Sequence, residues 1–103
     1  TYVDIIVIDV SFISLTKILG NCLNFLTKNG ELIALIKPQF EAGKENITKG
    51  GIVIREDIKA DVIVTIKNFA EEIGFVCEGE VVSSPIQGKK SGNQEFLIHL
   101  KKQ

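Results

Sequence analysis

The sequence predicts an α/β fold in which two parallel strands are joined by helical crossovers and an antiparallel pair of strands follows. Three observations indicate this class. Short runs rich in β-branched residues alternate with two stretches whose apolar residues recur every three or four positions. The last two apolar runs have no helical stretch between them, which is typical of a terminal hairpin. No apolar run approaches the ~20 residues that a membrane span needs, so all of these elements fit one water-soluble layered sheet.

The first strand is predicted at Val3–Asp9, where four β-branched residues follow one another from Ile5 to Ile8. A buried helical turn is the alternative, and the β-branched run disfavours it. Such a nearly continuous apolar run is typical of a strand that is covered on both faces. A second buried strand is predicted at Leu32–Ile36, and Pro38 ends it because proline cannot continue a central ladder.

An amphipathic helix is predicted between these two strands, from Phe12 to Leu26. Ser14 or Ser11 would cap its start, and the pair Asn29-Gly30 would end it in a left-handed conformation. Its apolar stripe comprises Phe12, Leu15, Ile18, Leu19, Cys22, Leu23 and Leu26.

A second helix is predicted from about Ile54 to Ile73 and ends at Gly74, after a loop over residues 39–50. The third strand, Val76–Val82, carries two glutamates where a central strand would carry apolar residues, which places it at the sheet edge. The long turn Ser83–Gln94 leads into a final strand, Phe96–Leu100. We expect the spatial order first, second, last, third.

The amino-acid composition of the chain argues against several classes of function. The 103 residues suffice for one domain, and 12 Lys and Arg against 13 Asp and Glu give a net charge of -1. This balance excludes a domain that binds nucleic acid through its global charge alone. Cys22 and Cys77 are too few for a disulfide framework and fit a reducing cytosol. With His99 as the single histidine, no metal site is expected.

The chain opens without a methionine and runs at once into a strand, so we expect it to be part of a longer protein. It has no secretory signal at its start and no glycine-rich turn between a strand and a helix. In a doubly wound fold, the half that cradles a nucleotide-type cofactor would therefore lie upstream.

Two ionisable residues end the predicted parallel strands, Asp9 and Lys37, and Glu95 begins the antiparallel one. Because these three positions share one edge of the sheet, we expect their side chains to lie within ~8 Å of one another. A lysine between two carboxylates can handle protons; the carboxylates hold its pKa up and burial lowers it, and the sequence leaves this balance open. The structural alternatives are a turn residue for Asp9 and a lysine at a strand end that reaches to solvent for Lys37.

Five blocks of sequence, in order, resemble the TlyA family. These proteins carry the name hemolysin and belong to the FtsJ-like RNA 2′-O-methyltransferases. The blocks are Asp9–Leu15, Ile36–Gly43, Lys49–Val53, Ser84–Gly88 and Gly92–Glu95.

The resemblance implies a Rossmann-like domain that binds S-adenosylmethionine, preceded by an S4-type RNA-binding domain, in a cytoplasmic enzyme that methylates ribosomal RNA. It implies that residues 1–103 are the C-terminal half of the methyltransferase domain, strands four to seven of seven. Of the family's Lys-Asp-Lys-Glu tetrad, Asp9, Lys37 and Glu95 match three members, and the first lysine would lie upstream.

Further roles follow for residues near this edge. Asp9, Ser11 and Phe12 are expected to contact the cofactor, and the lysines of the two loops are expected to contact RNA, namely Lys44, Lys49, Lys89 and Lys90. For Lys89-Lys90 the alternative is a solvated loop tip. Two other functions remain open: a membrane-active hemolysin and an RNA-binding module without catalysis. The first strand, Val3–Asp9, would have an unpaired edge in residues 1–103 alone, so we expect this isolated piece to self-associate.

Overall fold

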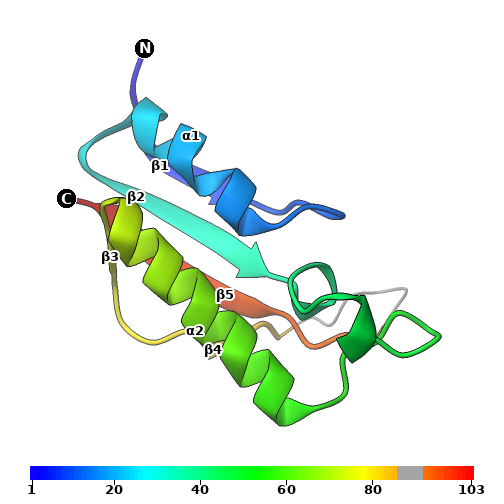
Figure 1. The fold of residues 1–103 in the computed structure, drawn as a ribbon. Helices are drawn as coiled ribbons and strands as arrows, with labels where there is room; N and C mark the ends of the chain where they lie inside the picture. Colours follow the sequence, from blue (N-terminus) through cyan, green and yellow to red (C-terminus); the bar gives the residue numbers. More distant parts are fainter. Residues whose placement is uncertain (86–91) are drawn as a thin grey trace.

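The computed structural model describes residues 1–85 and 92–103. It contains one mixed sheet with helices on one side and short 3₁₀ helices in the connections (Figure 1). The strands are β1 (Val3–Ile8), β2 (Leu26–Ile36), β3 (Phe75–Cys77), β4 (Val82–Ser83) and β5 (Phe96–Lys102). The helices are α1 (Leu19–Phe25) and α2 (Glu56–Ile73), and the 3₁₀ helices are η1 (Leu15–Lys17), η2 (Pro38–Phe40) and η3 (Lys44–Asn46).

The sheet has the order β1-β2-β5-β3, with β4 also paired to β5. β1 and β2 are parallel, whereas β5 runs antiparallel to both β2 and β3. The predicted fold class and strand order are therefore confirmed. Because Ile36 at the end of β2 lies opposite Phe96 at the start of β5, the residues that follow β2 and precede β5 meet at one edge.

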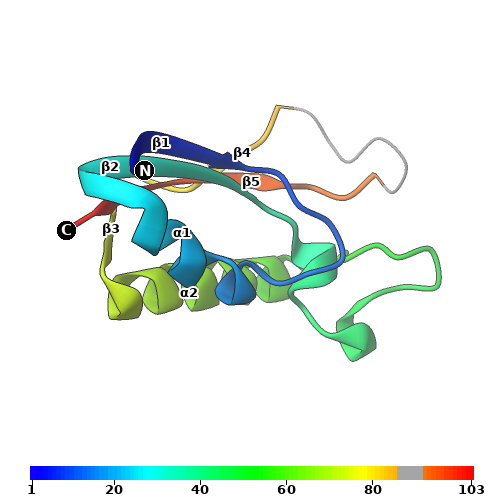
Figure 2. The same ribbon diagram turned by 90° about the horizontal axis from the view of Figure 1, so that it is seen from above.

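Both helices lie on the same face of the sheet (Figure 2). The two crossovers step in the same direction along the sheet, and right-handed connections then place both helices on one side. Alternate strand residues point into this core, among them Leu32, Ala34, Ile36, Ile98 and Leu100, which are at most 1% exposed. Ile66 and Ala70 of α2 pack against them.

Within the described residues, the other face of β1 is open. Val7 is 71% exposed and Ile5 is 55% exposed. The prediction that this strand is covered on both faces is therefore wrong for this chain. An apolar run of this kind indicates that side chains on both faces of the strand need to be buried. The two helices of this chain bury the side chains on one face only.

The first helical stretch is shorter than its periodicity predicts. Phe12 has a left-handed backbone (φ 66°) and lies outside any helix, and the cap at Ser14 begins η1 rather than a long α-helix. α1 ends at Phe25, and the amide of the capping residue Leu26 donates to the Leu23 carbonyl. The Lys102 ammonium also donates to the carbonyl oxygens of Leu23 (3.0 Å) and Leu26 (2.9 Å), so a residue of β5 holds this helix end.

The chain after α1 is already extended, so the predicted helix end at Asn29-Gly30 is wrong. Asn29 does adopt the left-handed conformation that its residue type favours (φ 65°), but it does so within β2. The register between β1 and β2 shifts beside this segment, between Val3 and Ile5.

α2 confirms its prediction and ends at Gly74, whose φ of 120° is accessible chiefly to glycine. The predicted strand Val76–Val82 is instead two short strands, β3 and β4. Gly79, with φ 67°, lies in the connection between them, which turns at this residue. Both strands pair with β5 at the sheet edge, as expected. In the described parts of the chain, no helix has the length and apolar character that a bilayer span requires.

Candidate active site

The edge where β1 and β2 end and β5 begins gathers three ionisable residues from distant parts of the chain. Asp9 directly follows β1, Lys37 directly follows β2, and Glu95 directly precedes β5. The carboxyl ends of parallel strands are where open α/β sheets bind ligands. The fold thus places these residues at the position where chemistry is expected.

The Lys37 ammonium lies 2.6 Å from Asp9 Oδ1 and donates to the Ser11 hydroxyl at 3.2 Å. The predicted convergence of Asp9 and Lys37 is confirmed. The lysine side chain is only 13% exposed, whereas the aspartate side chain is 63% exposed. The Lys37 ammonium is therefore largely buried, whereas the Asp9 carboxylate that pairs with it is accessible to solvent and to a bound molecule.

Glu95 lies at the same edge and is 7% exposed. Its Oε2 accepts a hydrogen bond from Gln39 Nε2 at 3.2 Å, and its backbone oxygen accepts from the Ser84 amide at 2.7 Å. Because Ile36 and Phe96 are opposite one another, Lys37 and Glu95 occupy the next opposed positions. Sequence reasoning missed Gln39, although it stands two residues after Lys37 in the same block.

The Gln39 amide has one satisfied and one unsatisfied end. Its Oε1 is buried and has no hydrogen-bond partner among residues 1–85 and 92–103. An unpaired buried acceptor costs about 1–3 kcal/mol. The nitrogen of the same amide binds the Glu95 carboxylate, so Gln39 gives this buried acid a polar side-chain partner at the site.

Glu41 is a second residue that sequence reasoning did not single out. Its Oε1 accepts from the Ser14 hydroxyl (2.6 Å) and its Oε2 accepts from the Leu15 amide (2.8 Å). The carboxylate thus satisfies a free amide at the start of η1. It ties the segment after β2 to the segment after β1, and so fixes the turn that carries Ser11 and Phe12.

Phe12 belongs to this edge and not to the core, where the predicted helical stripe would place it. It is 88% exposed, and its ring lies against Phe40 with 4.8 Å between ring centroids. A left-handed backbone is uncommon for a bulky residue, and such strain persists only where the surroundings impose it. The result is an aromatic ring presented to solvent beside Ser11.

The remaining predicted residues have simple placements. Lys44 begins η3 and Lys49 lies in the loop after it, and both are exposed. Lys89 and Lys90 lie outside the described residues. The His99 ring lies 2.7 Å from Glu31 Oε1, on the neighbouring strand β2. In the described part of the chain, no cluster of His, Cys, Asp or Glu is suited to a metal ion.

The two cysteines are far from this chemistry. Desolvation raises the pKa of the Cys22 thiol, and it is also the main cause that raises the pKa of the Cys77 thiol. Both thiols are therefore protonated at neutral pH to a greater extent than a free cysteine, which disfavours a nucleophilic role.

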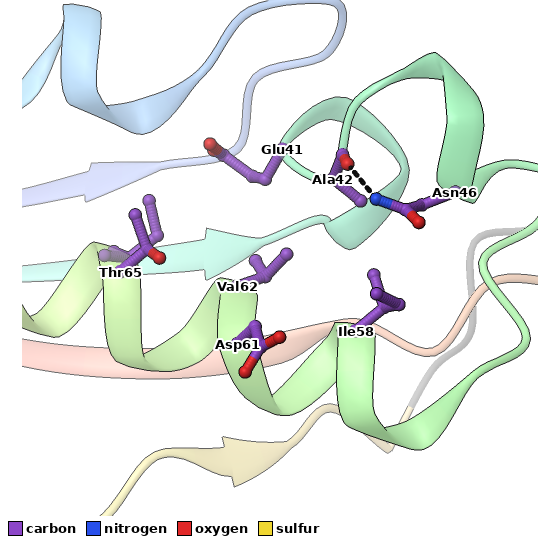
Figure 3. A pocket seen from close by; sticks show the side chains of 8 residues that line it. Glu41, Ala42, Asn46, Ile58, Asp61, Val62 and Thr65 are labelled. Carbon is purple, nitrogen blue, oxygen red and sulfur yellow. Dashed lines mark hydrogen bonds between the residues drawn. The ribbon is translucent and has the colours of Figure 1, made fainter.

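A small hollow of about 190 Å³ lies on the helical side, between α2 and the segment 41–46 (Figure 3). Asn46 lines it and donates to the Ala42 carbonyl at 2.7 Å. The carboxylate of Glu41 is already bound to Ser14 and Leu15. The residues of the strand edge do not line this hollow, so it is distinct from the candidate active site.

Two relatives of the chain are named as rRNA methyltransferases. YqxC of Bacillus subtilis, named as a candidate rRNA methyltransferase, is 46% identical over 93 residues, which are 90% of this chain and 32% of YqxC. TlyA of Mycobacterium tuberculosis, named a 16S/23S rRNA (cytidine-2′-O)-methyltransferase, is 36% identical over 101 residues, which are 98% of this chain and 37% of TlyA. The chain thus spans about a third of the length of these curated relatives.

A solved structure of a candidate hemolysin from Lactococcus lactis superimposes with a TM-score of 0.94 at 44% identity, covering 100% of this chain and 48% of that one. The sequence-family model of the FtsJ-like methyltransferases matches residues 1–102 of the chain. The chain therefore belongs to the FtsJ-like methyltransferase family, and TlyA is among its relatives.

Proposed function

We propose that this chain is the C-terminal part of a cytoplasmic enzyme that transfers a methyl group from S-adenosylmethionine to a ribose 2′-hydroxyl of ribosomal RNA. The observation that carries the proposal is the ion pair of Lys37 and Asp9 at the carboxyl ends of two parallel strands. The family of the chain and the name of its relative TlyA support the reaction and the substrate.

The residues at this edge fit a cationic cofactor. Asp9 presents a carboxylate that is 63% exposed, and Ser11 and Phe12 flank it on an exposed turn. Asp9, Ser11 and Phe12 would hold part of S-adenosylmethionine, and a segment preceding this chain would hold the rest. When bound, S-adenosylmethionine supplies an electrophilic methyl group.

A ribose 2′-hydroxyl is a weak nucleophile at neutral pH, so the enzyme must stabilise its oxygen as the proton leaves. Lys37, paired with Asp9, is suited to donate a hydrogen bond to that oxygen and to offset the negative charge that develops on it. The hydroxyl proton would pass to the exposed Asp9 carboxylate or to water as the oxygen attacks the methyl group. Glu95, hydrogen-bonded by Gln39, would complete the hydrogen-bonding frame on the opposed strand. Positioned acid–base groups of this kind contribute ~10²–10⁴-fold.

Phe12, 88% exposed and in contact with Phe40, offers a stacking face that suits the adenine ring of the cofactor. The RNA substrate would be held by lysines around this edge. Lys44 at the start of η3 and Lys49 in the loop after it are exposed and would contact phosphates, and we assign the same role to Lys89 and Lys90.

The test is methyl transfer by the longer enzyme that contains this chain, with radiolabelled S-adenosylmethionine and purified ribosomal subunits. Digestion to nucleosides and mass spectrometry locate the methyl group. A 2′-O-methylated nucleoside that disappears in Lys37→Met supports the proposal, and a methyl group on a base overturns it. Dye release from lipid vesicles without methyl transfer would favour the hemolysin, and RNA binding without methyl transfer would favour a non-catalytic module.

A further inference from the structure

A second polar hollow, of about 520 Å³, lies between the start of α2 and the described segments on either side of residues 86–91. Lys59, Ser83 and Gln94 contribute its polar side chains, together with Ser84. Asp9, Lys37 and Glu95 do not line the hollow. Two of its lining residues nevertheless adjoin Glu95: Gln94 precedes it in the chain, and the Ser84 amide donates to its backbone oxygen at 2.7 Å.

The cation of this hollow is Lys59, whose side chain is only 12% exposed. Its ammonium donates to Glu56 Oε1 at 3.1 Å and to Gln94 Oε1 at 3.3 Å. An ammonium has three donors, so two acceptors among the described residues leave capacity for a third. Gln94 is neutral, and the Glu56 side chain is 83% exposed, so solvent screens its charge strongly.

This arrangement leaves positive charge largely uncompensated at a nearly buried position. Removing an ammonium from water costs several kcal/mol unless an anion and further hydrogen bonds offset it. A surface ion pair with Glu56 contributes little toward that cost. The site is thus electrostatically suited to an additional anion.

The walls of the hollow are fixed by the fold. Asn93, 1% exposed, accepts from the Val53 amide at 2.9 Å and donates to the Gly51 carbonyl at 2.9 Å. Gln94 Nε2 donates to the Ser83 hydroxyl at 3.0 Å, which ties the two described segments to each other. The polar groups around Lys59 are therefore held in place before any ligand binds.

We propose that Lys59, with Gln94 and Ser83, binds a phosphodiester of the RNA substrate next to the nucleotide that is methylated. This inference rests on the proposed function, because it takes RNA as the ligand. The ammonium supplies the charge, the Gln94 side chain positions the ammonium, and the Ser83 hydroxyl adds a hydrogen-bonding group. The contact would orient the backbone that leads to the 2′-hydroxyl at Lys37.

The experiment measures the affinity of the longer enzyme for a fluorescein-labelled single-stranded RNA of about 12 nucleotides at several salt concentrations. Lys59→Gln should weaken binding about tenfold and reduce the slope of log K against log salt by about 0.7, the value for one lost phosphate contact. Lys59→Arg should keep the slope. Lys67→Gln, on the same helix and outside the hollow, is the matched control and should behave as wild type.

Gln94→Ala separates phosphate binding by Lys59 from a structural role of Lys59. This variant removes the hydrogen bond between Gln94 and Lys59 and leaves the positive charge of Lys59 in place. The slope should be retained in Gln94→Ala and reduced in Lys59→Gln. A wild-type slope in Lys59→Gln, or a wild-type enzyme that does not bind the RNA, overturns the subsite. Methyl transfer is measured separately, so an enzyme that binds RNA through Lys59 but methylates nothing contradicts the proposed function and not the subsite.

Discussion

Lys37→Met in the longer enzyme separates catalysis from stability. Methionine keeps an apolar stem and removes the ammonium. The lost ion pair is partly exposed, with Asp9 63% accessible, so it stabilises the fold by about 1 kcal/mol or less. Asp9 is left solvated, which avoids the large penalty of an unpaired buried charge. We expect the variant to remain folded.

The effect on turnover should be much larger. A positioned acid–base group contributes at least ~10²-fold, which corresponds to about 2.7 kcal/mol of transition-state stabilisation. We therefore expect kcat for rRNA methylation to fall at least about 100-fold with little change in RNA affinity, because the ammonium acts on the reacting oxygen.

The assay is single-turnover methyl transfer, with circular dichroism and urea unfolding to check the fold. Lys28→Met is the matched control, since Lys28 is exposed near the opposite end of β2. It should keep wild-type turnover. If Lys37→Met retains more than about a tenth of the wild-type rate, the role of the ammonium is refuted.

Three further predictions concern stability, reactivity and assembly. Asn93→Ala removes buried hydrogen bonds to Val53 and Gly51 and should lower the free energy of unfolding by about 1–3 kcal/mol in urea titrations; a loss below about 0.5 kcal/mol would contradict the buried network. Because burial raises the pKa of Cys77, iodoacetamide should alkylate this thiol more slowly at pH 8 than free cysteine, and an equal rate would argue against its burial. Residues 1–103 alone should self-associate through the open edge and face of β1, where Val7 is 71% exposed, and light scattering that finds only monomer would contradict this.

The strand order and the shared edge could be predicted from sequence because each depends on short, strongly patterned segments. The β-branched run ending at Asp9 and the apolar run ending at Lys37 define two strands, and topology then brings their ends together. The start of an antiparallel strand adds Glu95 to the same edge. The pattern could not reveal that, among residues 1–85 and 92–103, the helices cover only one face of this sheet (Figure 2).

The first helix shows where periodicity fails. The spacing of apolar residues from Phe12 to Leu26 indicates which side chains are suited to burial. The left-handed backbone at Phe12 is incompatible with a helix that begins at this residue. The helix end is also held by Lys102, 79 residues after Leu23, whose ammonium donates to the carbonyl oxygens of Leu23 and Leu26. A contact at that separation has no local signature in the sequence.

The supporting residues of the site were missed for the same reason. Gln39 acts on Glu95 across 56 positions, and Glu41 acts on Ser14 across 27. A glutamine or glutamate in a loop rich in polar residues is not distinctive on its own. Only the folded chain shows that these two side chains bind the Glu95 carboxylate and the segment that follows Phe12.

The central claim is that the edge formed by Asp9, Lys37 and Glu95 receives the reacting ribose. The most direct measurement is a structure of the longer enzyme with an RNA substrate and a non-reactive analogue of S-adenosylmethionine. We predict the target 2′-oxygen at about 2.6–3.2 Å from the Lys37 ammonium, on the side where Asp9 is bound. A ribose bound away from this edge, or a nucleobase atom in place of the 2′-oxygen at Lys37, would contradict the claim.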